Sequence, residues 1–257
     1  MTEAYLRFEN VTKRFGTVDV VSTTNLSVAR GSFVVFLGPS GCGKTTLMRM
    51  VGGLDEPTQG RILLDGRQIR KPDRSRGMVF QSYSSFPWAT VAQNIAFGMR
   101  YRHDIGAADK RERVRTYLDL FGLADFADVY PSRISGGMRQ RVAIARTLAA
   151  GSEILLMDEP FGALDALTRE RLQVELRQIQ AREGKTVVFV THDVEEAVFL
   201  ADRIILFSKR PATVVADLDI NATLGGERPL EIRESQTFFE LRNQVLHLIR
   251  NVTGYAK

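Results

Sequence analysis

The most informative stretch of the sequence reads Phe33-Val34-Val35-Phe36-Leu37-Gly38-Pro39-Ser40-Gly41-Cys42-Gly43-Lys44-Thr45-Thr46. Its first five residues are all apolar, which indicates a short strand buried on both faces. Residues 38–46 match the pattern G-x-x-x-x-G-K-[ST], and a helical pattern continues from Lys44 to Val51. A glycine-rich turn with an incidental Lys-Thr is the alternative, but the strand–turn–helix setting favours a phosphate-binding loop.

Each residue type in this loop has a physical role in holding a phosphate. Glycines let the backbone curl until successive N–H groups point at an anion, and the N-terminus of the following helix adds partial positive charge. Lys44 is a mobile charge that can reach the β- and γ-phosphates, and the Thr45 hydroxyl is placed to bind Mg²⁺. A reactive thiol at Cys42 is conceivable, but a loop position whose backbone does the binding is the simpler interpretation. The predicted nucleotide-binding residues here are Gly38, Pro39, Ser40, Gly41, Cys42, Gly43, Lys44, Thr45 and Thr46.

A second apolar strand, at residues 154–157, ends in two acids, Asp158 and Glu159. Burying charge is costly, so adjacent carboxylates at the end of a buried strand indicate a use for them. Asp158 can hold Mg²⁺ directly or through water, and Glu159 can orient or deprotonate an attacking water. Two solvated acids at a strand end are the alternative, which the phosphate-binding loop in the same chain disfavours.

The rest of the sequence alternates buried strands with helices. Strands are expected in the first 30 residues and at 33–37, 61–64, 77–80, 154–157, 187–190 and 203–207. Helices are expected at 44–51, 137–150, 166–182, 194–200 and 238–249, and a loop at 221–236. Residues 91–129 have a helical pattern that indicates a helical subdomain inserted into an α/β core. The alternation predicts a mainly parallel sheet covered on both faces.

Composition restricts the class of protein. The 257 residues are 44% hydrophobic and 25% charged, which argues against a disordered chain. No apolar run approaches the roughly 18–20 residues that cross a bilayer, the N-terminus lacks the pattern of a secretory signal, and a single cysteine excludes a disulfide framework. The net charge of +5 suits phosphate ligands, anionic membrane surfaces or nucleic acid, although a solvated surface with surplus arginine is the simpler explanation. We therefore expect a cytoplasmic protein.

The segment Ser135-Gly136-Gly137-Met138-Arg139-Gln140 lies shortly before the acidic strand. With the phosphate-binding loop and the two acids, it makes the chain resemble the nucleotide-binding subunit of an ATP-binding cassette (ABC) transporter, whose Ser-Gly-Gly-x-x-Gln signature has this position. The signature usually opens with Leu, where this chain has Ile134. Ser135, Gly136 and Gly137 would begin a helix and present N–H groups and a hydroxyl to a phosphate; a plain helix N-cap is a compatible interpretation.

The resemblance extends to four further positions. Gln81 matches the glutamine that senses Mg²⁺ and the attacking water, and Asp165, in Ala163-Leu164-Asp165, matches the loop that communicates across an ATP dimer. His192 matches the histidine that contacts the γ-phosphate, and Phe15 matches the aromatic residue that stacks on adenine. A surface glutamine, a structural histidine and a core phenylalanine are the plainer alternatives.

The resemblance covers about residues 4–219 and implies a phosphate-loop NTPase fold. This α/β fold has a mainly parallel sheet, an N-terminal antiparallel β subdomain and an inserted α-helical subdomain. We expect an ABC ATPase domain at residues 1–219, with the helical subdomain at about 82–150. Residues 220–257 would form a loop and a helix packed on the core, and the positions near helix spacing there are Phe239, Leu241, Val245, Leu246 and Ile249.

The resemblance also implies a mechanism and partners. Two cassettes, most simply two identical copies, would enclose two ATP molecules head to tail and drive membrane-spanning permease subunits and, indirectly, a solute-binding protein. The catalytic residues would be Glu159, His192, Lys44 and Gln81, and the Mg²⁺ ligands Thr45, Gln81 and Asp158. The protein would lie on the cytoplasmic face of the membrane and bind no nucleic acid.

Three aromatic residues, Tyr83, Phe86 and Trp88, follow Gln81 closely. In the family this region forms the groove that receives a coupling helix of the permease, and local packing is the alternative. The Phe-Pro-Trp element makes the chain resemble the ATPase subunits of importers of nitrate, aliphatic sulfonates, taurine and related small solutes. An ATPase of an exporter or lipid-trafficking complex is a second hypothesis. A third, a soluble cassette acting on DNA or ribosomes, is disfavoured because the chain has one cassette and only about 90 residues between the loop and the signature.

Overall fold

Two units make up the structure, a computed structural model that describes residues 4–80 and 85–253. The first unit comprises Met1–Asp73 and Arg177–Lys257, and the second comprises Arg74–Leu176. No helix in the part of the chain that the structure describes is both long and apolar enough to cross a membrane. Each unit is described by itself.

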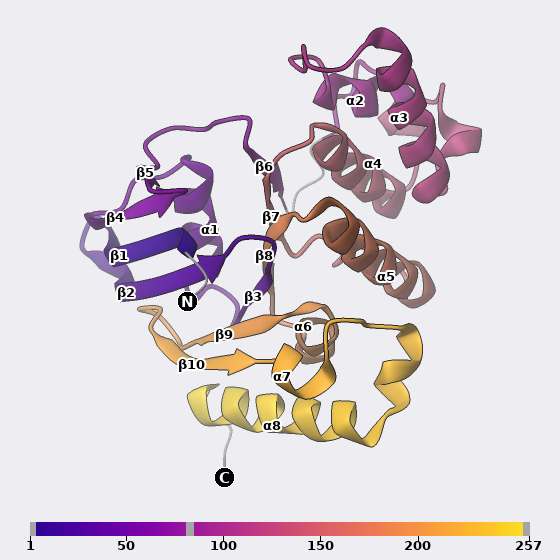
Figure 1. The fold of residues 1–257 in the computed structure, drawn as a ribbon. Helices are drawn as coiled ribbons and strands as arrows, with labels where there is room; N and C mark the ends of the chain where they lie inside the picture. Colours follow the sequence, from indigo (N-terminus) through magenta and orange to yellow (C-terminus); the bar gives the residue numbers. More distant parts are fainter. Residues whose placement is uncertain (1–3, 81–84, 254–257) are drawn as a thin grey trace. The chain divides into compact units, whose positions relative to one another are not determined.

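An antiparallel sheet opens the first unit, as the sequence predicts. It consists of β1 (Ala4–Phe15), β2 (Val18–Ala29), β4 (Gln59–Leu64) and β5 (Arg67–Gln68), in the order β2-β1-β4-β5 (Figure 1). Apolar and polar residues alternate along β1, so Leu6 and Phe8 are buried on one face while Arg7 is exposed on the other. This sheet carries Phe15 at the end of its first strand.

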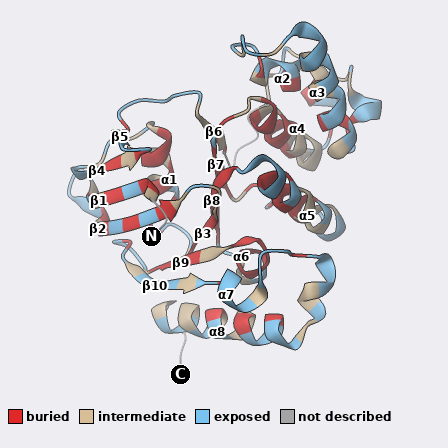
Figure 2. Cartoon of the chain, in the orientation of Figure 1, coloured by how far each residue is buried: buried red, intermediate tan, exposed pale blue. Residues whose placement is uncertain are grey.

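Parallel strands form the centre of the same unit. Strand β3 (Phe33–Leu37) pairs in parallel with β8 (Thr186–Thr191) on one side and β9 (Arg203–Phe207) on the other. Every residue of β3 and β8 is buried, which Figure 2 shows as continuous red. Complete burial explains why their sequences are apolar without alternation. Helix α1 (Lys44–Gly52) follows β3 after the loop of residues 38–43, confirming the predicted strand–turn–helix.

Strand β10 (Val214–Asp219) was not predicted from the sequence. It pairs antiparallel with β9, and its residues alternate between half-buried and exposed. Two aspartates and an alanine among its six residues give it weak strand propensity. The mainly parallel sheet therefore has one antiparallel edge strand, a common arrangement in α/β proteins.

The second unit combines two parallel strands with helices. Strands β6 (Arg76–Val79) and β7 (Ile154–Asp158) pair in register. Helices α2 (Val91–Gly98), α3 (Ala107–Leu120) and α4 (Gly136–Ala149) follow β6 in the chain, and α2 packs on α4 (Figure 1). The expected helical region at 91–129 is thus correct in kind but broken into α2, α3 and a short 3₁₀ turn at Ala124–Phe126. A second such turn, Pro131–Arg133, leads into α4, and α5 (Ala166–Glu183) runs from the second unit into the first.

The C-terminal segment corrects two expectations. The predicted loop at 221–236 contains a short helix, α7 (Asn221–Leu224), and a 3₁₀ turn at Leu230–Glu234. Helix α8 (Gln236–Thr253) is longer than expected and packs on α6 (Val194–Leu200). Its buried aromatic residue is Phe238 rather than Phe239, which is 48% exposed, while Leu241 and Val245 are buried as expected. The other two positions expected on the packed face, Leu246 and Ile249, are only partly buried.

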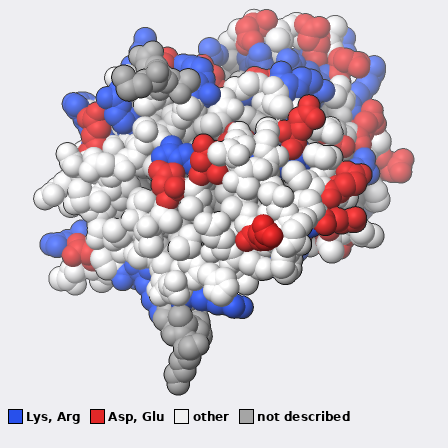
Figure 3. Space-filling view, turned by 60° about the horizontal axis from the view of Figure 1, so that its bottom comes forward, with Lys and Arg blue, Asp and Glu red and all other residues white. Residues whose placement is uncertain are grey.

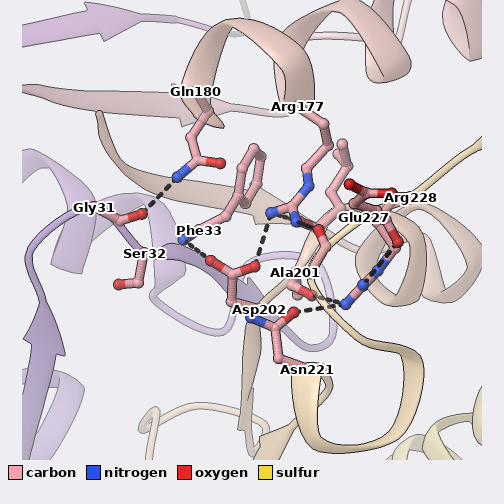
Figure 4. Close-up of polar contacts among 12 residues, drawn as sticks. Gly31, Ser32, Phe33, Arg177, Gln180, Ala201, Asp202, Asn221, Glu227 and Arg228 are labelled. Atoms are coloured by element: carbon pink, nitrogen blue, oxygen red, sulfur yellow. Dashed lines mark hydrogen bonds and ion pairs between the residues drawn. The ribbon is translucent and has the colours of Figure 1, made fainter. Parts of the chain in front are cut away.

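Asp202 joins this C-terminal segment to the central strands (Figure 4). Its side chain accepts hydrogen bonds from the backbone N–H of Phe33 at 2.7 Å and from Arg177 NH1 at 2.8 Å. Its backbone carbonyl accepts from the N–H of Ile220 at 2.9 Å, and Arg177 NH2 donates to the carbonyl of Gly226 at 2.7 Å. Through its carboxylate and its backbone carbonyl, Asp202 thus ties the start of β3, helix α5 and the chain after β10 together.

We predict that Asp202→Ala lowers the free energy of unfolding by about 3 kcal/mol, because it leaves the buried Arg177 guanidinium without its carboxylate. The matched control is Asp217→Ala, which removes the carboxylate from the more exposed Arg203–Asp217 pair and should cost about 1 kcal/mol or less. Urea unfolding followed by circular dichroism measures both. Equal losses for the two variants would contradict this account of Asp202.

Candidate nucleotide-binding site

The loop between β3 and α1 has the shape that a phosphate-binding loop requires. Gly38 and Gly43 have φ angles of +156° and +128°, which side chains rarely allow. A Cβ atom on Gly38 would lie 2.8 Å from the carbonyl oxygen of Phe207, and one on Gly43 would lie 2.9 Å from that of Val20. The two glycines are therefore required both for the backbone curl and for the close packing of the loop on its neighbours.

Lys44 lies within this loop and is only 4% exposed. Its Nζ donates hydrogen bonds to the carbonyl oxygens of Gly38 at 2.8 Å and Pro39 at 2.7 Å. The ammonium group is thus held beside the loop backbone, where a phosphate would be bound. Cys42 is 2% exposed, with its Sγ 3.8 Å from the Lys44 Nζ. This burial disfavours the alternative of an accessible reactive thiol, because reactive cysteines are at least partly exposed.

His192 lies at the same sheet edge as the phosphate-binding loop. Leu37, just before the loop, pairs with Thr191 in the parallel register of β3 and β8, so both strands end together. His192 follows Thr191 and is exposed. Asp193 then caps α6, its Oδ1 accepting the N–H of Glu196 at 3.0 Å. The structure therefore brings together two sequence-predicted features that are about 150 residues apart.

Phe15 is exposed at the end of β1, which disfavours the alternative of a core phenylalanine. The Nζ of Lys13 lies 4.6 Å from the ring centroid and donates a hydrogen bond to the carbonyl of Glu56 at 2.7 Å. A cation at this distance from an aromatic ring is attracted to its face. The contact between Lys13 and Phe15 was not predicted from the sequence. The one sequence feature that indicates it is their spacing, because residues two positions apart on a strand lie on the same face.

In the second unit, Asp158 is the last residue of strand β7 and Glu159 follows it. Asp158 is 5% exposed, and Glu159 has a φ of +45°, in the left-handed region. The carbonyl of Glu159 accepts a hydrogen bond from the Gln140 side chain at 3.4 Å, and from the N–H of Gly162 at 3.2 Å. The backbone thus changes conformation directly after Asp158, where the strand ends.

The signature segment begins α4 as the sequence predicts. The exposed Ser135 caps the helix, its Oγ accepting the N–H of Met138 at 3.2 Å. A Cβ on Gly137 would lie 3.1 Å from Leu164, so the start of α4 lies against the loop that carries Asp165. The N–H of Thr168 donates to Asp165 at 2.9 Å, and this bond holds the pKa of the Asp165 carboxyl below its usual range. These predicted residues, Ser135, Gly136, Gly137 and Asp165, therefore lie close together.

The predicted Mg²⁺ ligands are hard oxygen donors, as Mg²⁺ prefers. Thr45 is exposed in the first turn of α1, and Asp158 ends β7. Gln81, the third predicted ligand, lies outside the described residues. Among the residues that are described, no group of three or more His, Cys, Asp or Glu side chains is arranged to hold a metal.

One contact of the phosphate-binding loop was missed by the sequence analysis. Arg210, in the turn between β9 and β10, donates hydrogen bonds to the carbonyl of Gly41. An arginine beside a proline in a turn carries no motif, so nothing in the sequence marks this contact.

Comparison with known proteins shows the family to which the chain belongs. A profile of the ABC transporter family matches residues 21–162, so the chain belongs to the ABC transporter family. It is an ATPase of that family's ATP-binding cassette type. A nitrate import ATP-binding protein of Synechocystis sp. is 45% identical over 242 residues, covering 91% of this chain and 90% of the relative. An aliphatic sulfonates import ATP-binding protein of Bacillus thuringiensis is 42% identical over 236 residues, covering 91% and 90%.

A solved structure supports the fold assignment. The dimeric post-hydrolysis state of an ATP-binding cassette, bound to ADP and phosphate, is 34% identical to this chain with a TM-score of 0.75. The match covers 84% of this chain and 98% of that one. The predicted fold class, a cassette ATPase with a mainly parallel sheet, is therefore confirmed.

We predict that Gly38→Ala weakens ATP binding at least roughly tenfold, because its Cβ would collide with the Phe207 carbonyl and force the loop to shift. Gly226→Ala is the matched control, since a Cβ there meets nothing within 4 Å. Titration with a fluorescent ATP analogue measures both affinities. Unchanged binding by Gly38→Ala would show that the loop tolerates this displacement.

Proposed function

We propose that this chain is the ATP-hydrolysing subunit of an importer for a small solute of the nitrate, sulfonate or taurine type. The observation that carries the proposal is the similarity to import ATP-binding proteins along nine-tenths of the chain. Both of those relatives are named for the import of small oxoanion-bearing solutes. A cassette of an exporter or lipid-trafficking complex is the competing assignment.

In this proposal the loop residues 38–46 bind the phosphates of ATP. Lys44 exchanges its carbonyl partners for the β- and γ-phosphates, and the exposed Phe15 ring stacks on the adenine. Thr45, Asp158 and Gln81 bind the Mg²⁺ that, when present, neutralises the charge developing on the phosphates. Phe15 and the loop residues 38–46, which carry the proposed contacts to ATP, all belong to the first unit.

Glu159 is proposed as the residue that orients and deprotonates the attacking water, and His192 as the contact to the γ-phosphate. The strained backbone at Glu159 supports a functional role, since such conformations persist where surrounding structure imposes them. His192 is exposed after the end of β8, which pairs with the end of β3 where the phosphate-binding loop begins, and this position supports the proposed contact. Gln81 keeps its predicted role in sensing Mg²⁺ and water.

Dimerisation completes the proposal. The exposed hydroxyl of Ser135 and the N-terminus of α4 are suited to contact the ATP of a second copy. A related cassette forms a dimer in its solved post-hydrolysis structure. Two identical copies related by two-fold symmetry would then share two nucleotides, and Asp165, beside the signature segment, would lie near the contact.

A groove in the second unit is proposed to receive the permease. It has a volume of about 320 Å³ and is lined by aromatic and arginine side chains, among them Phe86, Phe97, Tyr101 and Arg146. Phe86 contacts Phe97 with ring centroids 4.6 Å apart and stacks on Trp88 at 5.3 Å. Local packing accounts for Phe86, but Trp88 is 73% exposed and Tyr101 67%, which favours a partner. Tyr83 lies outside the described residues.

The protein would act on the cytoplasmic face of the membrane, bound to permease subunits and indirectly to a solute-binding protein. On the face drawn in Figure 3, Lys and Arg side chains are interspersed with Asp and Glu rather than gathered in a basic stripe. This distribution gives no support to a nucleic-acid partner on that face.

The domain limits proposed above, an ATPase at 1–219 and a C-terminal element at 220–257, are kept.

We predict that Glu159→Gln retains ATP binding but reduces ATP hydrolysis at least about a hundredfold, because the amide cannot accept the proton of the attacking water. Glu153→Gln is the matched control, an exposed acid just before the same strand, and should hydrolyse ATP at the wild-type rate. Phosphate release measures turnover, and light scattering with chromatography detects an ATP-dependent dimer. Wild-type turnover by Glu159→Gln would refute the catalytic assignment.

A second prediction tests the importer assignment directly. The tagged protein, purified from detergent-solubilised membranes of its native host, should carry a polytopic permease whose gene neighbours a solute-binding protein. Trp88→Ala should reduce the recovered permease at least roughly fivefold, since exposed aromatic side chains act as anchors in such interfaces. Recovery with ribosomes or DNA-processing proteins, and without any membrane protein, would refute the importer assignment.

A further inference from the structure

The turn that joins β9 and β10 lies directly against the phosphate-binding loop. The carbonyl of Phe207, at the end of β9, occupies the position 2.8 Å from where a Cβ of Gly38 would be. Ala212, at the other end of the turn, has its Cβ 3.2 Å from where a Cβ of Gly43 would be. Gly38 and Gly43 therefore both abut one hairpin that contains none of the recognised nucleotide-binding motifs.

Arg210 extends from this turn to the loop. Its NH2 and Nε both donate hydrogen bonds to the carbonyl oxygen of Gly41, at 2.8 and 3.3 Å. The two residues are 169 positions apart in the chain. The contact is made by an exposed side chain, so it contributes little to the packing of the core.

The backbone on either side of Arg210 is fixed. The N–H of Ala212 donates to the carbonyl of Val20 at 2.8 Å, and the carbonyl of Ala212 accepts from the N–H of Ser22 at 3.0 Å. Within the turn, the N–H of Ser208 donates to the carbonyl of Thr213 at 2.9 Å. The hairpin is thus held to β2, and Arg210 is anchored on a supported backbone when it contacts the loop.

A hydrogen bond at the Gly41 carbonyl restrains the orientation of the peptide unit that carries the next N–H. The peptide unit between Gly41 and Cys42 is planar and trans, so its C=O and N–H point in opposite directions. Gly41 has a φ of +70° and Gly43 one of +128°, and glycines reach both signs of φ readily. In the structure the Cys42 N–H of this unit donates to the carbonyl of Pro39 at 3.4 Å. Rotation of the unit would break this bond together with the Arg210 contact and turn the carbonyl oxygen of Gly41 to the opposite side.

We propose that Arg210 is a positioning residue for ATP binding, which prevents this rotation and keeps the loop in its anion-binding conformation. It acts through the Gly41 carbonyl and not on the nucleotide itself, while its charge adds to the positive field at the loop. The inference rests on the ATPase activity of the family and not on the importer assignment.

The test compares Arg210→Ala and Arg210→Lys with the wild type in steady-state ATP hydrolysis. We expect Arg210→Ala to raise the KM for ATP roughly three- to tenfold and to change kcat less than about twofold, because the lost hydrogen bond is one made to a charged donor. Arg210→Lys should restore the KM in part, since an ammonium keeps the charge but not the two-pronged contact. A fluorescent ADP analogue should show the same change in affinity.

Two further measurements distinguish the positioning role of Arg210 from a general effect of its charge and from an effect on protein stability. Arg67→Ala, on the exposed edge strand β5, removes one positive charge elsewhere in the unit and should leave the KM unchanged. Hydrogen exchange in the nucleotide-free protein should be faster at residues 38–46 in Arg210→Ala, with the thermal midpoint unchanged. A KM within twofold of wild type for Arg210→Ala, or an equal rise for Arg67→Ala, would overturn the proposal.

Discussion

The parallel pairing of β3 with β8 and β9 is the constraint on which the nucleotide-binding unit depends. Leu37 pairs with Thr191 on one side and with Leu206 on the other, so three strands end at the same edge. The phosphate-binding loop, His192 and the turn that carries Arg210 follow these three strand ends. A shift of register by one residue would displace the segments that follow these strands relative to one another along the sheet edge, so the pairing fixes where the functional residues lie.

The sequence predicts a segment's structure where local residue chemistry determines it. It does not where the packing partner in the folded chain determines it. The buried run at Phe33–Leu37 and the loop glycines are predictable, because apolar continuity and positive φ restrict the residue types. Phe238 and Phe239 are adjacent apolar residues on α8, and the elements packed against α8, which include α6, decide which one is buried. Strand β10 was missed because its pairing with β9, and not its own propensity, makes it a strand.

Two arginines near the C-terminal segment are partly or largely buried beside a single carboxylate. Arg177 and Arg228 share the surroundings of one carboxylate, Asp202, and burial together with the charge of Arg177 lowers the pKa of Arg228 to about 10. Arg228 remains charged at neutral pH and donates to the carbonyl of Ala201 and to Asn221 (Figure 4). These carbonyl and amide oxygens replace lost hydration, so the arginines hold residues 221–228 onto the core.

Glu159 is distinguished by its backbone independently of any family resemblance. Among the residues that the structure describes, three other than glycine have positive φ, namely Asn10, Asp65 and Glu159. Asn10 lies at a register shift between β1 and β2, and Asp65 precedes Gly66 in a tight turn, positions that Asn and Asp tolerate well. Glu has no such preference, so the conformation of Glu159 is imposed by its neighbours, and the Gln140 side chain, which belongs to the signature segment, bonds to its carbonyl. Strain of this kind persists where it serves a function, and the geometry thus supports the same residue that the Asp-Glu motif selects.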